Sequence, residues 1–490
     1  MIEGAIVDRG NTLEHARLAQ TAWAQVAVAR RLEIIRRLRR SIAENAGVLA
    51  AAVDGAKKRR PGETLAAEVL PLAEACRFLE RRARRILKPR RLPRYALFSF
   101  FAGVRVEVRR EPFGVILVIG PSNYPLFLPG VQALQALAAG NAVYVKPGAG
   151  GAEACNLLAR LLTESGLDER LLTVCSESVG DAQAVIAAGA DKVILTGSAE
   201  TGRAVLGELA PRLVPSTMEL SGCDAVFVLG GADAELVVRA LAFGLSLNSG
   251  ATCIAPRRVF VVAGAAPELE TRLAEEVRSF PPCHPDEHAA ARARELAQEA
   301  VSQGAACLTP LAESAESCRP IIVTGASPGM RLLQEDVAAP VLSVVRVSDE
   351  DAAVRAADEC PYALGATVFG ETEQAVRFAG RVNAGVVVVN DIIVPTADPR
   401  VPFGGRKRSG FGVTRGAEGL LEMTQPKAIL VRTSGRRRHL EAGFGDAERI
   451  LRAYLDVAHG RSGAGRCRAL WRMLKLTLAG RQADGEEKAT

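Results

Sequence analysis

The sequence has few histidines, few aromatic residues and no paired cysteine motif. Aromatic residues make up 4% of the chain, and the ten cysteines form no CxxC pair. Unpaired thiols of this kind suit a reducing compartment, where a reactive cysteine can stay free. Ser-His-Asp chemistry is not expected, because none of the five histidines lies in a motif: they are His15, His284, His288, His439 and His459.

Two further absences concern membranes and secretion. The most apolar stretch, residues 114–145, is interrupted by three prolines and two asparagines, so it is not expected to span a bilayer. The amino terminus lacks a basic region followed by an apolar core, and no secretion signal is expected. A cytoplasmic protein without a nucleic-acid partner is therefore predicted.

Length and periodicity predict an α/β protein of more than one domain. The chain has 490 residues, too many for one ordinary core, and 48% of them are apolar. Residues 12–87 have the spacing of helices with one apolar face. From residue 114 to 218, and again from 219 to about 390, apolar strand patterns alternate with helical ones. This order is typical of parallel sheets covered by helices on both faces.

Cys253 is the main candidate for a nucleophile. It ends the segment Asn248-Ser-Gly-Ala-Thr-Cys253, whose small residues leave room for a substrate to reach the sulfur. Glu219, upstream on a separate apolar segment, is a carboxylate that can act as a base for the thiol or for water. A lone cysteine is more often a small buried hydrophobe, so the prediction depends on the accompanying motifs.

Three other segments place polar residues where predicted strands end. Asn123 follows an apolar run, at the position where open α/β sheets bind ligands, and its amide can donate to an oxyanion. Lys146 ends a short strand, where a cation suits a ribose or a phosphate. A third strand leads into a glycine-bounded turn and a helix, whose amino end can bind an anion, although the turn is not a GxGxxG fingerprint. Its candidate cofactor-binding residues are Gly197, Ser198, Thr201 and Gly202.

In order and strand context, these segments resemble the NAD(P)-dependent aldehyde dehydrogenase superfamily from about Glu111 to about Lys427. The segment Gln334-Glu-Asp336-Val-Ala338-Ala-Pro340 resembles the family's Glu-Glu-Ile-Phe-Gly-Pro, and Pro402-Phe-Gly-Gly resembles its closing motif. The form Asn-Ser-Gly-x-Thr-Cys-x-Ala-Pro looks most like the class 3 branch, which acts on fatty and aromatic aldehydes.

The resemblance implies a fold, a mechanism and partners. Residues 1–90 and 108–218 would form a Rossmann-type cofactor domain, 219–395 an α/β catalytic domain, and 91–107 with 396–432 a β-arm that makes a homodimer or homotetramer. Cys253 would attack the aldehyde, Asn123 would hold the oxyanion, and Glu219 would activate the hydrolytic water. NAD or NADP would be the cofactor, with Asp336 on the nicotinamide ribose.

Several positions depart from the family pattern. Glu219-Leu-Ser221-Gly-Cys223 replaces Glu-Leu-Gly-Gly-Lys, which predicts crowding near the base. The glutamate that binds the adenosine ribose in NAD-preferring members is Ala149, so NADP is expected to be tolerated. Ala338 replaces an aromatic residue that packs on the nicotinamide.

The carboxyl-terminal residues 433–490 are basic and amphipathic, and most of the formal net charge of +7 comes from them. Such helices can make a peripheral contact with an anionic membrane, as the carboxyl ends of some class 3 members do. The plainer interpretation is a solvated helix packed on the protein body or on a partner subunit, and it is favoured.

Two alternatives to an active dehydrogenase follow from the sequence. The departures at Ser221, Cys223, Ala149 and Ala338 would suit a weak or inactive scaffold with the same fold. A relative that transfers the acyl group without hydrolysis is disfavoured, because Glu219 is present. A zinc site at Cys283, His284 and His288 is also disfavoured, since these residues lie in a Pro-rich polar stretch without a second cysteine pair.

Overall fold

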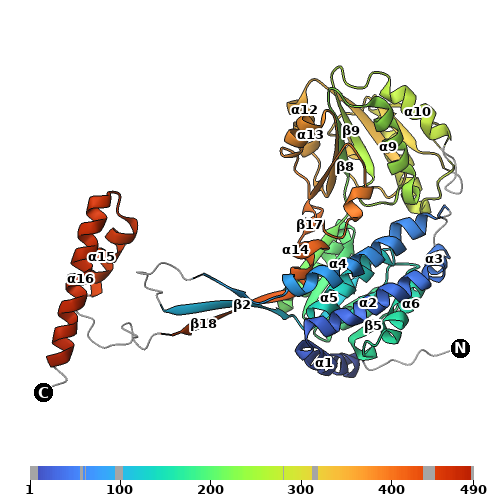
Figure 1. Cartoon of the computed structure of the whole chain (residues 1–490). Coiled ribbons are helices and arrows are strands. Elements are labelled where there is room, and N and C mark those ends of the chain that lie inside the picture. The colour runs from blue at the N-terminus through green and yellow to red at the C-terminus, as the bar shows by residue number, and fades with distance from the viewer. Residues whose placement is uncertain are drawn as a thin grey trace. The chain divides into compact units, whose positions relative to one another are not determined.

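Figure 1 shows the chain in a computed structural model, which describes residues 9–55, 59–60, 62–93, 103–279, 281–311, 318–433 and 447–486. Contacts divide the chain into two units. Unit 1 consists of Met1–Pro89 and Arg109–Lys427, and unit 2 of Arg90–Val108 and Ala428–Thr490. Each unit is described by itself below.

The first sheet of unit 1 has six strands in the order β17-β7-β6-β3-β4-β5. All neighbours are parallel except β17, which pairs antiparallel with β7. The central strand β3 is an unbroken apolar run, buried at every residue because helices cover both faces. The strands are β3 (Val115–Ile119), β4 (Ala142–Lys146), β5 (Leu172–Val174), β6 (Lys192–Gly197), β7 (Ser216–Leu220) and β17 (Gly410–Phe411).

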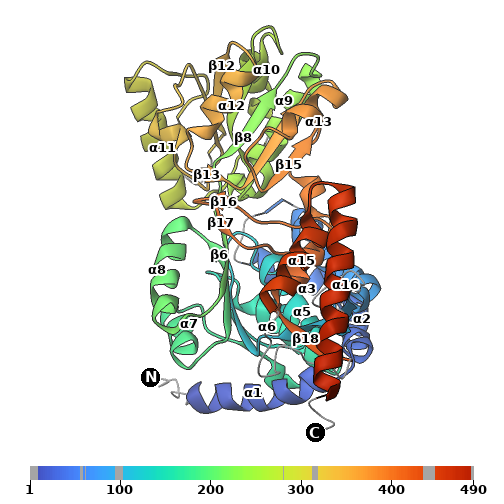
Figure 2. The same ribbon diagram turned by 90° about the vertical axis from the view of Figure 1, so that its left-hand side faces the viewer.

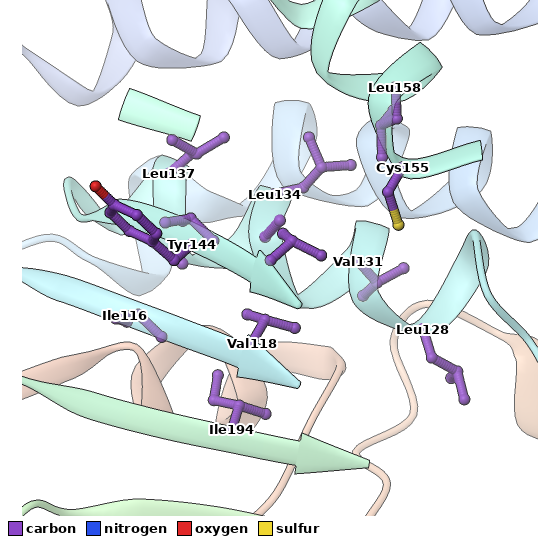
Figure 3. Close-up of a cluster of buried hydrophobic side chains, with 14 of the residues drawn as sticks. Ile116, Val118, Leu128, Val131, Leu134, Leu137, Tyr144, Cys155, Leu158 and Ile194 are labelled. Atoms are coloured by element: carbon purple, nitrogen blue, oxygen red, sulfur yellow. The ribbon is translucent and has the colours of Figure 1, made fainter. Parts of the chain in front are cut away.

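Helices α7 and α8 lie on one side of this sheet and α5 and α6 on the other (Figure 2). Helix α5 is buried along its whole length, and Figure 3 shows its Val131, Leu134 and Leu137 beside Ile116 and Ile194 of the central strands. This core fixes the ends of the strands that carry the candidate residues. The helices are α5 (Phe127–Ala139), α6 (Ala152–Glu164), α7 (Val179–Ala187) and α8 (Ala199–Leu209).

The amino-terminal part of unit 1 is helical, as the periodicity predicts. Leu32, Ile35, Leu38 and Ile42 form the buried stripe of the second helix, with arginines on its outer face. These helices add their apolar faces to the core of the first sheet. They are α1 (Arg9–Gln25), α2 (Val28–Glu44), α3 (Ala46–Asp54), a π-helical turn (Leu65–Val69) and α4 (Leu70–Ile86).

The second sheet of unit 1 has seven strands in the order β10-β11-β12-β9-β8-β14-β15, and only β10 is antiparallel. Its strands are β8 (Asp224–Val228), β9 (Pro256–Val262), β10 (Ala306–Cys307), β11 (Ile321–Thr324), β12 (Val341–Val347), β14 (Gly365–Phe369) and β15 (Val386–Val389). The helices of this region are α9 (Ala234–Ser246), α10 (Leu269–Ser279), α11 (Glu287–Ser302), α12 (Glu350–Asp358) and α13 (Thr372–Ala379). The two parallel sheets establish the mixed α/β fold.

Residues 396–427 group with unit 1, whereas the sequence predicts them as part of the arm. The reason is local packing, since Phe403 and Thr414 are buried beside the first sheet and pair with each other through both backbone amides. This segment also includes α14 (Gly416–Glu422) and the small pair of β13 (Tyr362–Ala363) with β16 (Arg406–Lys407).

Unit 2 contains a three-stranded sheet and a helical pair. The sheet has the order β1-β2-β18, and its strands are β1 (Arg90–Arg91), β2 (Val104–Pro112) and β18 (Thr424–Arg432), of which β2 and β18 extend into unit 1. The helices are α15 (Ala447–His459) and α16 (Gly463–Glu486), which pack on each other. Residues 94–102 of the predicted arm lie outside the described residues. In the described part of the chain, no helix combines the length and the apolarity needed to cross a membrane.

Candidate active site

Cys253 follows a tight turn at the end of α9. Asn248 and Ser249 have φ values of 50° and 52°, and Gly250 follows with φ +76°. A Cβ on Gly250 would lie 2.5 Å from the backbone nitrogen of Pro340, so only glycine fits there. The run of small residues in the sequence therefore has a second cause besides substrate access, because the turn packs directly on a neighbouring backbone.

Two cavities meet at Cys253. One has a volume of about 480 Å³ and the other of about 270 Å³, and both are lined by Glu219, Thr252 and Cys253. The larger cavity is mainly apolar, with Phe127 and Phe243 in its wall. The smaller one has a more polar wall. The structure thus brings the predicted thiol and carboxylate to the junction of two distinct binding spaces.

Glu219 lies on β7 and is held from one side. The Thr414 hydroxyl donates to its Oε2 at 2.7 Å, while Oε1 is buried without a hydrogen-bond partner. Burial raises the pKa of this carboxyl group, against the opposing effects of the Arg415 charge and the Thr414 hydrogen bond. A buried carboxylate with one free oxygen is suited to accept a proton from a reacting group.

The Asn123 side chain is fixed against the turn that carries Cys253. Its Nδ2 donates to the Ala251 carbonyl at 2.8 Å, and its Oδ1 accepts from the Tyr124 amide at 3.0 Å. The Tyr124 hydroxyl is 2.6 Å from the hydroxyl of Thr252. Because a primary amide has two N–H groups, one remains for a ligand after the bond to Ala251.

A buried ion pair that the sequence analysis missed joins these two loops. Arg59 donates to Glu68 at 2.6 Å, to the Asn123 carbonyl at 2.5 Å and to the Asn248 side chain at 3.1 Å. The side chains of Arg59 and Glu68 are 2% and 0% exposed. Glu68 in turn accepts from the Leu126 amide at the start of α5. No local pattern signals this brace, since its partners are far apart along the chain.

The smaller cavity contains several of the predicted cofactor residues. Asn123, Gly197, Ser198, Asp336 and Ala338 line it. Ser198 caps α8, its Oγ accepting from the backbone amide of Thr201 at 3.1 Å. Burial raises the pKa of Asp336, opposed by the Arg257 charge and by a hydrogen bond from Ser221.

Thr201, Gly202 and Lys146 are not among the residues lining this cavity. Gly202 has a structural role, because a Cβ there would lie 2.8 Å from Leu220 Cδ1, so the glycine lets α8 pack closely on β7. Lys146 ends β4 beside Ile119 of β3. Lys146 thus lies at the carboxyl end of β4, and Thr201 and Gly202 lie in the first turn of α8, after the carboxyl end of β6.

Glu177 is a carboxylate near Lys146 that the sequence analysis missed. It accepts from the backbone amides of Gly150 and Ala152, each at 3.0 Å, and these bonds lower its pKa. Desolvation lowers the pKa of Lys146, and the charge of Glu177 opposes that shift. Although Ala149 lacks a carboxylate, the region around Lys146 is not free of negative charge.

Ser221, the residue predicted to crowd Glu219, is hydrogen-bonded to two neighbouring segments. The Ser221 amide donates to the Gly197 carbonyl at 3.0 Å, and its hydroxyl bonds to Asp336. Cys223 is buried with its sulfur 3.8 Å from the Leu333 carbonyl. Both departures from the family pattern are thus accommodated on the side of the Asp336 segment.

Cys283, His284 and His288 do not form a metal-ligand cluster. No group of three or more His, Cys, Asp or Glu residues suited to a metal ion occurs among the described residues. The Cys283 amide and carbonyl pair with those of Cys318, and the His284 amide donates to the Ser249 hydroxyl. These contacts explain the local structure without a metal.

The parallel sheet, the capped helix end and the polar cavity beside a thiol define the class of a nicotinamide-dependent oxidoreductase. The chain belongs to the aldehyde dehydrogenase family, whose family model matches residues 7–429. It is an enzyme that oxidises aldehydes with NAD or NADP.

Relatives of this family agree with that assignment. A 4,4'-diapolycopene aldehyde oxidase of a Methylomonas species is 30% identical, covering 86% of this chain and 81% of its own length. A succinate-semialdehyde dehydrogenase (NADP+) of Deinococcus radiodurans is 31% identical, with 85% and 89% covered. The crystal structure of an NADP-dependent glyceraldehyde-3-phosphate dehydrogenase from Bacillus halodurans with NADP matches with a TM-score of 0.80, 25% identity and coverage of 87% and 92%.

Proposed function

We propose that Cys253 is the nucleophile, Glu219 the general base and Asn123 an oxyanion donor in the oxidation of an aldehyde to a carboxylate. The observation that supports this assignment best is that Cys253 and Glu219 line both cavities at their junction. A residue that must reach the substrate on one side and the cofactor on the other has to lie there. Asn123 lines the smaller cavity and is bonded to the cysteine turn.

In the first step the Cys253 thiolate attacks the aldehyde carbon, and the carbonyl oxygen becomes an oxyanion. The free N–H of Asn123 and the Cys253 backbone N–H would stabilise that charge, and one such donor is worth about 2.7–4 kcal/mol. A nicotinamide held in the smaller cavity beside Asp336 and Cys253 would supply the hydride acceptor for this oxidation. This oxidation leaves the acyl group on Cys253 as a thioester.

In the second step water hydrolyses the thioester. Glu219 takes a proton from the water while the water oxygen attacks the acyl carbon. The carbon–sulfur bond then breaks, the carboxylic acid is released, and the proton on Glu219 can return to the Cys253 sulfur. A carboxylate whose pKa is raised by burial is a better base than one in water, and such a base contributes roughly 10²- to 10⁴-fold. Burial also raises the pKa of the Cys253 thiol, so a neighbouring positive charge is needed to stabilise its thiolate.

The larger cavity suits an extended apolar aldehyde. Its wall includes Ala67, Phe127, Leu128, Phe243, Ile254 and Phe403. The Methylomonas relative is named for the aldehyde of 4,4'-diapolycopene, which is an apolar polyene. We propose apolar aldehydes over small polar ones, in keeping with the predicted class 3 likeness.

For the cofactor, the donor set fits a dinucleotide. The α8 end with Gly197 and Ser198 would hold the pyrophosphate, Lys146 the adenosine ribose, and Asp336 the nicotinamide ribose, with Thr201 and Gly202 shaping the helix start. Residues 1–90 and 108–218 then serve as the cofactor domain and 219–395 as the catalytic domain.

Two variants test the catalytic assignment. Cys253→Ala should abolish turnover while NAD(P) still binds, and Glu219→Gln should release one burst of reduced cofactor and then stall with an acyl adduct on the Cys253 peptide. Cys467, an exposed cysteine in unit 2, provides the matched control as Cys467→Ala, which should leave turnover unchanged. Turnover retained by Cys253→Ala would overturn the proposal.

Unit 2 supports two finer proposals about partners. Its β-sheet is proposed as the element that joins subunits into a homodimer or homotetramer of a cytoplasmic enzyme. The helical pair exposes Leu451, Leu455, Trp471 and Leu474 among basic residues, which suits a peripheral contact with an anionic membrane. Packing on a partner subunit is the competing proposal.

Tryptophan fluorescence separates these two outcomes. The chain has two tryptophans, of which Trp23 is buried and Trp471 is 63% exposed. If the helices bind a membrane, vesicles containing phosphatidylglycerol should shift the emission to shorter wavelength, and added salt should reverse the shift. Truncation after Thr433 that changes the oligomeric state, with no shift in the full chain, would favour subunit packing.

A further inference from the structure

Arg415 is a buried cation in the wall of the larger cavity. It is 5% exposed and lines the cavity together with Glu219 and Cys253. Its Nη1 donates to the Thr396 carbonyl at 2.6 Å, and its guanidinium carbon lies 4.2 Å from the centroid of the Phe403 ring. Its Nε is buried without a hydrogen-bond partner. Among the described residues, no carboxylate forms an ion pair with this guanidinium, so no directly bonded anion offsets its positive charge.

The backbone at Arg415 has an unusual conformation. Its φ and ψ are 59° and 174°, a region that is essentially restricted to glycine and costs an arginine about 1–3 kcal/mol. The backbone amide donates to Gln135 at 3.3 Å, and the preceding residue, Thr414, holds Glu219. Surrounding structure therefore enforces a conformation that places this side chain in the cavity wall, which indicates a functional reason for the cation.

Several ionisable groups besides Arg415 lie near Cys253. The carboxyl groups of Glu219, Asp224 and Asp336 each raise the pKa of Cys253, and Glu219 and Asp336 line the smaller cavity together with the thiol. Arg257 is the second cation near the thiol, but its guanidinium donates to the Gly250 and Ala339 carbonyls and lines the smaller cavity. Arg60 and Arg415 both line the larger cavity, but Arg60 is paired with Glu63 at 3.4 Å. The charge of Arg415 lowers the pKa of both Cys253 and Glu219.

Histidine does not supply this charge. No histidine is among the described residues that line either cavity. The Tyr124 hydroxyl, also near the thiol, is bonded to Thr252 and is neutral at physiological pH, since burial raises its pKa.

We propose that Arg415 is the fixed counter-ion of the catalytic pair, a positioning residue that stabilises the Cys253 thiolate and then the Glu219 carboxylate from the substrate side. This inference rests on the proposed roles of Cys253 and Glu219. It goes beyond them by naming Arg415 as the residue whose charge stabilises the ionised forms of Cys253 and Glu219.

The test measures the thiolate directly and needs no turnover. Wild-type protein, Arg415→Gln and Arg415→Lys are alkylated with iodoacetamide between pH 6 and pH 10, and the modified Cys253 peptide is quantified by mass spectrometry. Loss of the charge should slow alkylation of Cys253 at pH 8 by at least about tenfold, since below the pKa each unit of upward shift reduces the thiolate fraction tenfold. Arg415→Lys, which keeps the charge, should stay much closer to wild type.

Cys467 provides an internal control, because it is exposed in unit 2 and should react equally in all three proteins. Equal Cys253 profiles in wild type and Arg415→Gln would overturn the proposal. An equal profile combined with a raised KM for succinate semialdehyde would also overturn it, and would show that Arg415 binds a substrate carboxylate.

If Arg415→Gln does not fold, the lysine variant decides alone. A tenfold slower Cys253 reaction with the charge retained would overturn the proposal, and a profile within about threefold of wild type would support it, because threefold is only half a pKa unit. The proposed function fails separately, through turnover in Cys253→Ala. The alkylation profile does not depend on that outcome.

Discussion

Thr414→Val removes the hydrogen bond that Glu219 receives and leaves a side chain of nearly the same shape. The Thr414 hydroxyl donates to Glu219 Oε2 at 2.7 Å inside a buried site, and the other carboxylate oxygen has no partner to compensate. A hydrogen bond to a charged group contributes about 1.5–3 kcal/mol. At 1.36 kcal/mol per pKa unit, its loss should raise the pKa of Glu219 by about 1–2 units.

The direction follows from which form of Glu219 the bond favours. A donated hydrogen bond stabilises the carboxylate, so its removal stabilises the protonated acid, which cannot accept a proton from water. The acidic limb of the kcat profile should therefore move to higher pH. At pH values below the limb, kcat of Thr414→Val should be about 10- to 100-fold lower than that of the wild type, because a pKa higher by 1–2 units reduces the fraction of deprotonated Glu219 by that factor. Well above the limb, both enzymes should have the same kcat.

The assay is the pH dependence of kcat with one small soluble aldehyde, followed by cofactor reduction. Thr424→Val is a matched control, because Thr424 is a buried threonine whose hydroxyl donates at 2.7 Å to the Leu421 carbonyl, away from both cavities. Its profile should keep the wild-type limb. A Thr414→Val limb within about 0.3 units of wild type, well under the smallest shift expected from the bond, would refute the argument.

Two further predictions concern the brace and the cofactor. Arg59→Met should lower the free energy of unfolding by about 3–5 kcal/mol in urea titrations, since it leaves Glu68 as an uncompensated buried charge, and a loss under about 1 kcal/mol would contradict that reasoning. The unmodified enzyme should have a kcat/KM for NADP at least comparable with that for NAD. Ala149→Glu should shift this ratio towards NAD. Glu177→Gln should shift it towards NADP, because the change removes negative charge near Lys146. NAD selectivity in the unmodified enzyme above about a hundredfold, roughly 2.7 kcal/mol, would count against this account, as would an unchanged kcat/KM ratio in Glu177→Gln.

The sequence was sufficient to predict the strands and site residues that are determined by short, contiguous segments. Strand β3 is a continuous β-branched run, and such runs identify buried parallel strands whatever surrounds them. Asn123 follows β3 and Gly197 is the last residue of β6, and the structure places both at the smaller cavity with Glu219 and Cys253. Their motifs were recognisable because each motif includes the glycine or proline residues of the turn that follows the strand.

Residues that act through distant partners could not be predicted in the same way. In the sequence, Arg59 belongs to a run of basic residues, which is typical of an exposed segment. In the structure its side chain is buried and hydrogen-bonded to Glu68, Asn123 and Asn248. Arg415 has no local feature that distinguishes it from a surface arginine, because its burial depends on Phe403 and Thr396. Contacts between residues so far apart in the chain depend on tertiary packing. The periodicity of a single sequence does not reveal such contacts.

The arrangement of Cys253 and Glu219, the proposed catalytic pair, follows from the crossing between the two sheets. Glu219 is the next-to-last residue of β7 in the first sheet, and the chain enters β8 of the second sheet at Asp224. Cys253 lies just before β9. A Cβ on Gly222 would lie 3.0 Å from the Cys253 carbonyl oxygen, so the crossing passes directly over the nucleophile turn. Since each sheet supplies one member of the pair, their separation depends on the segments that link the sheets. Arg59 and the Thr414–Arg415 pair are such links, and for that reason their loss should disturb chemistry as well as stability.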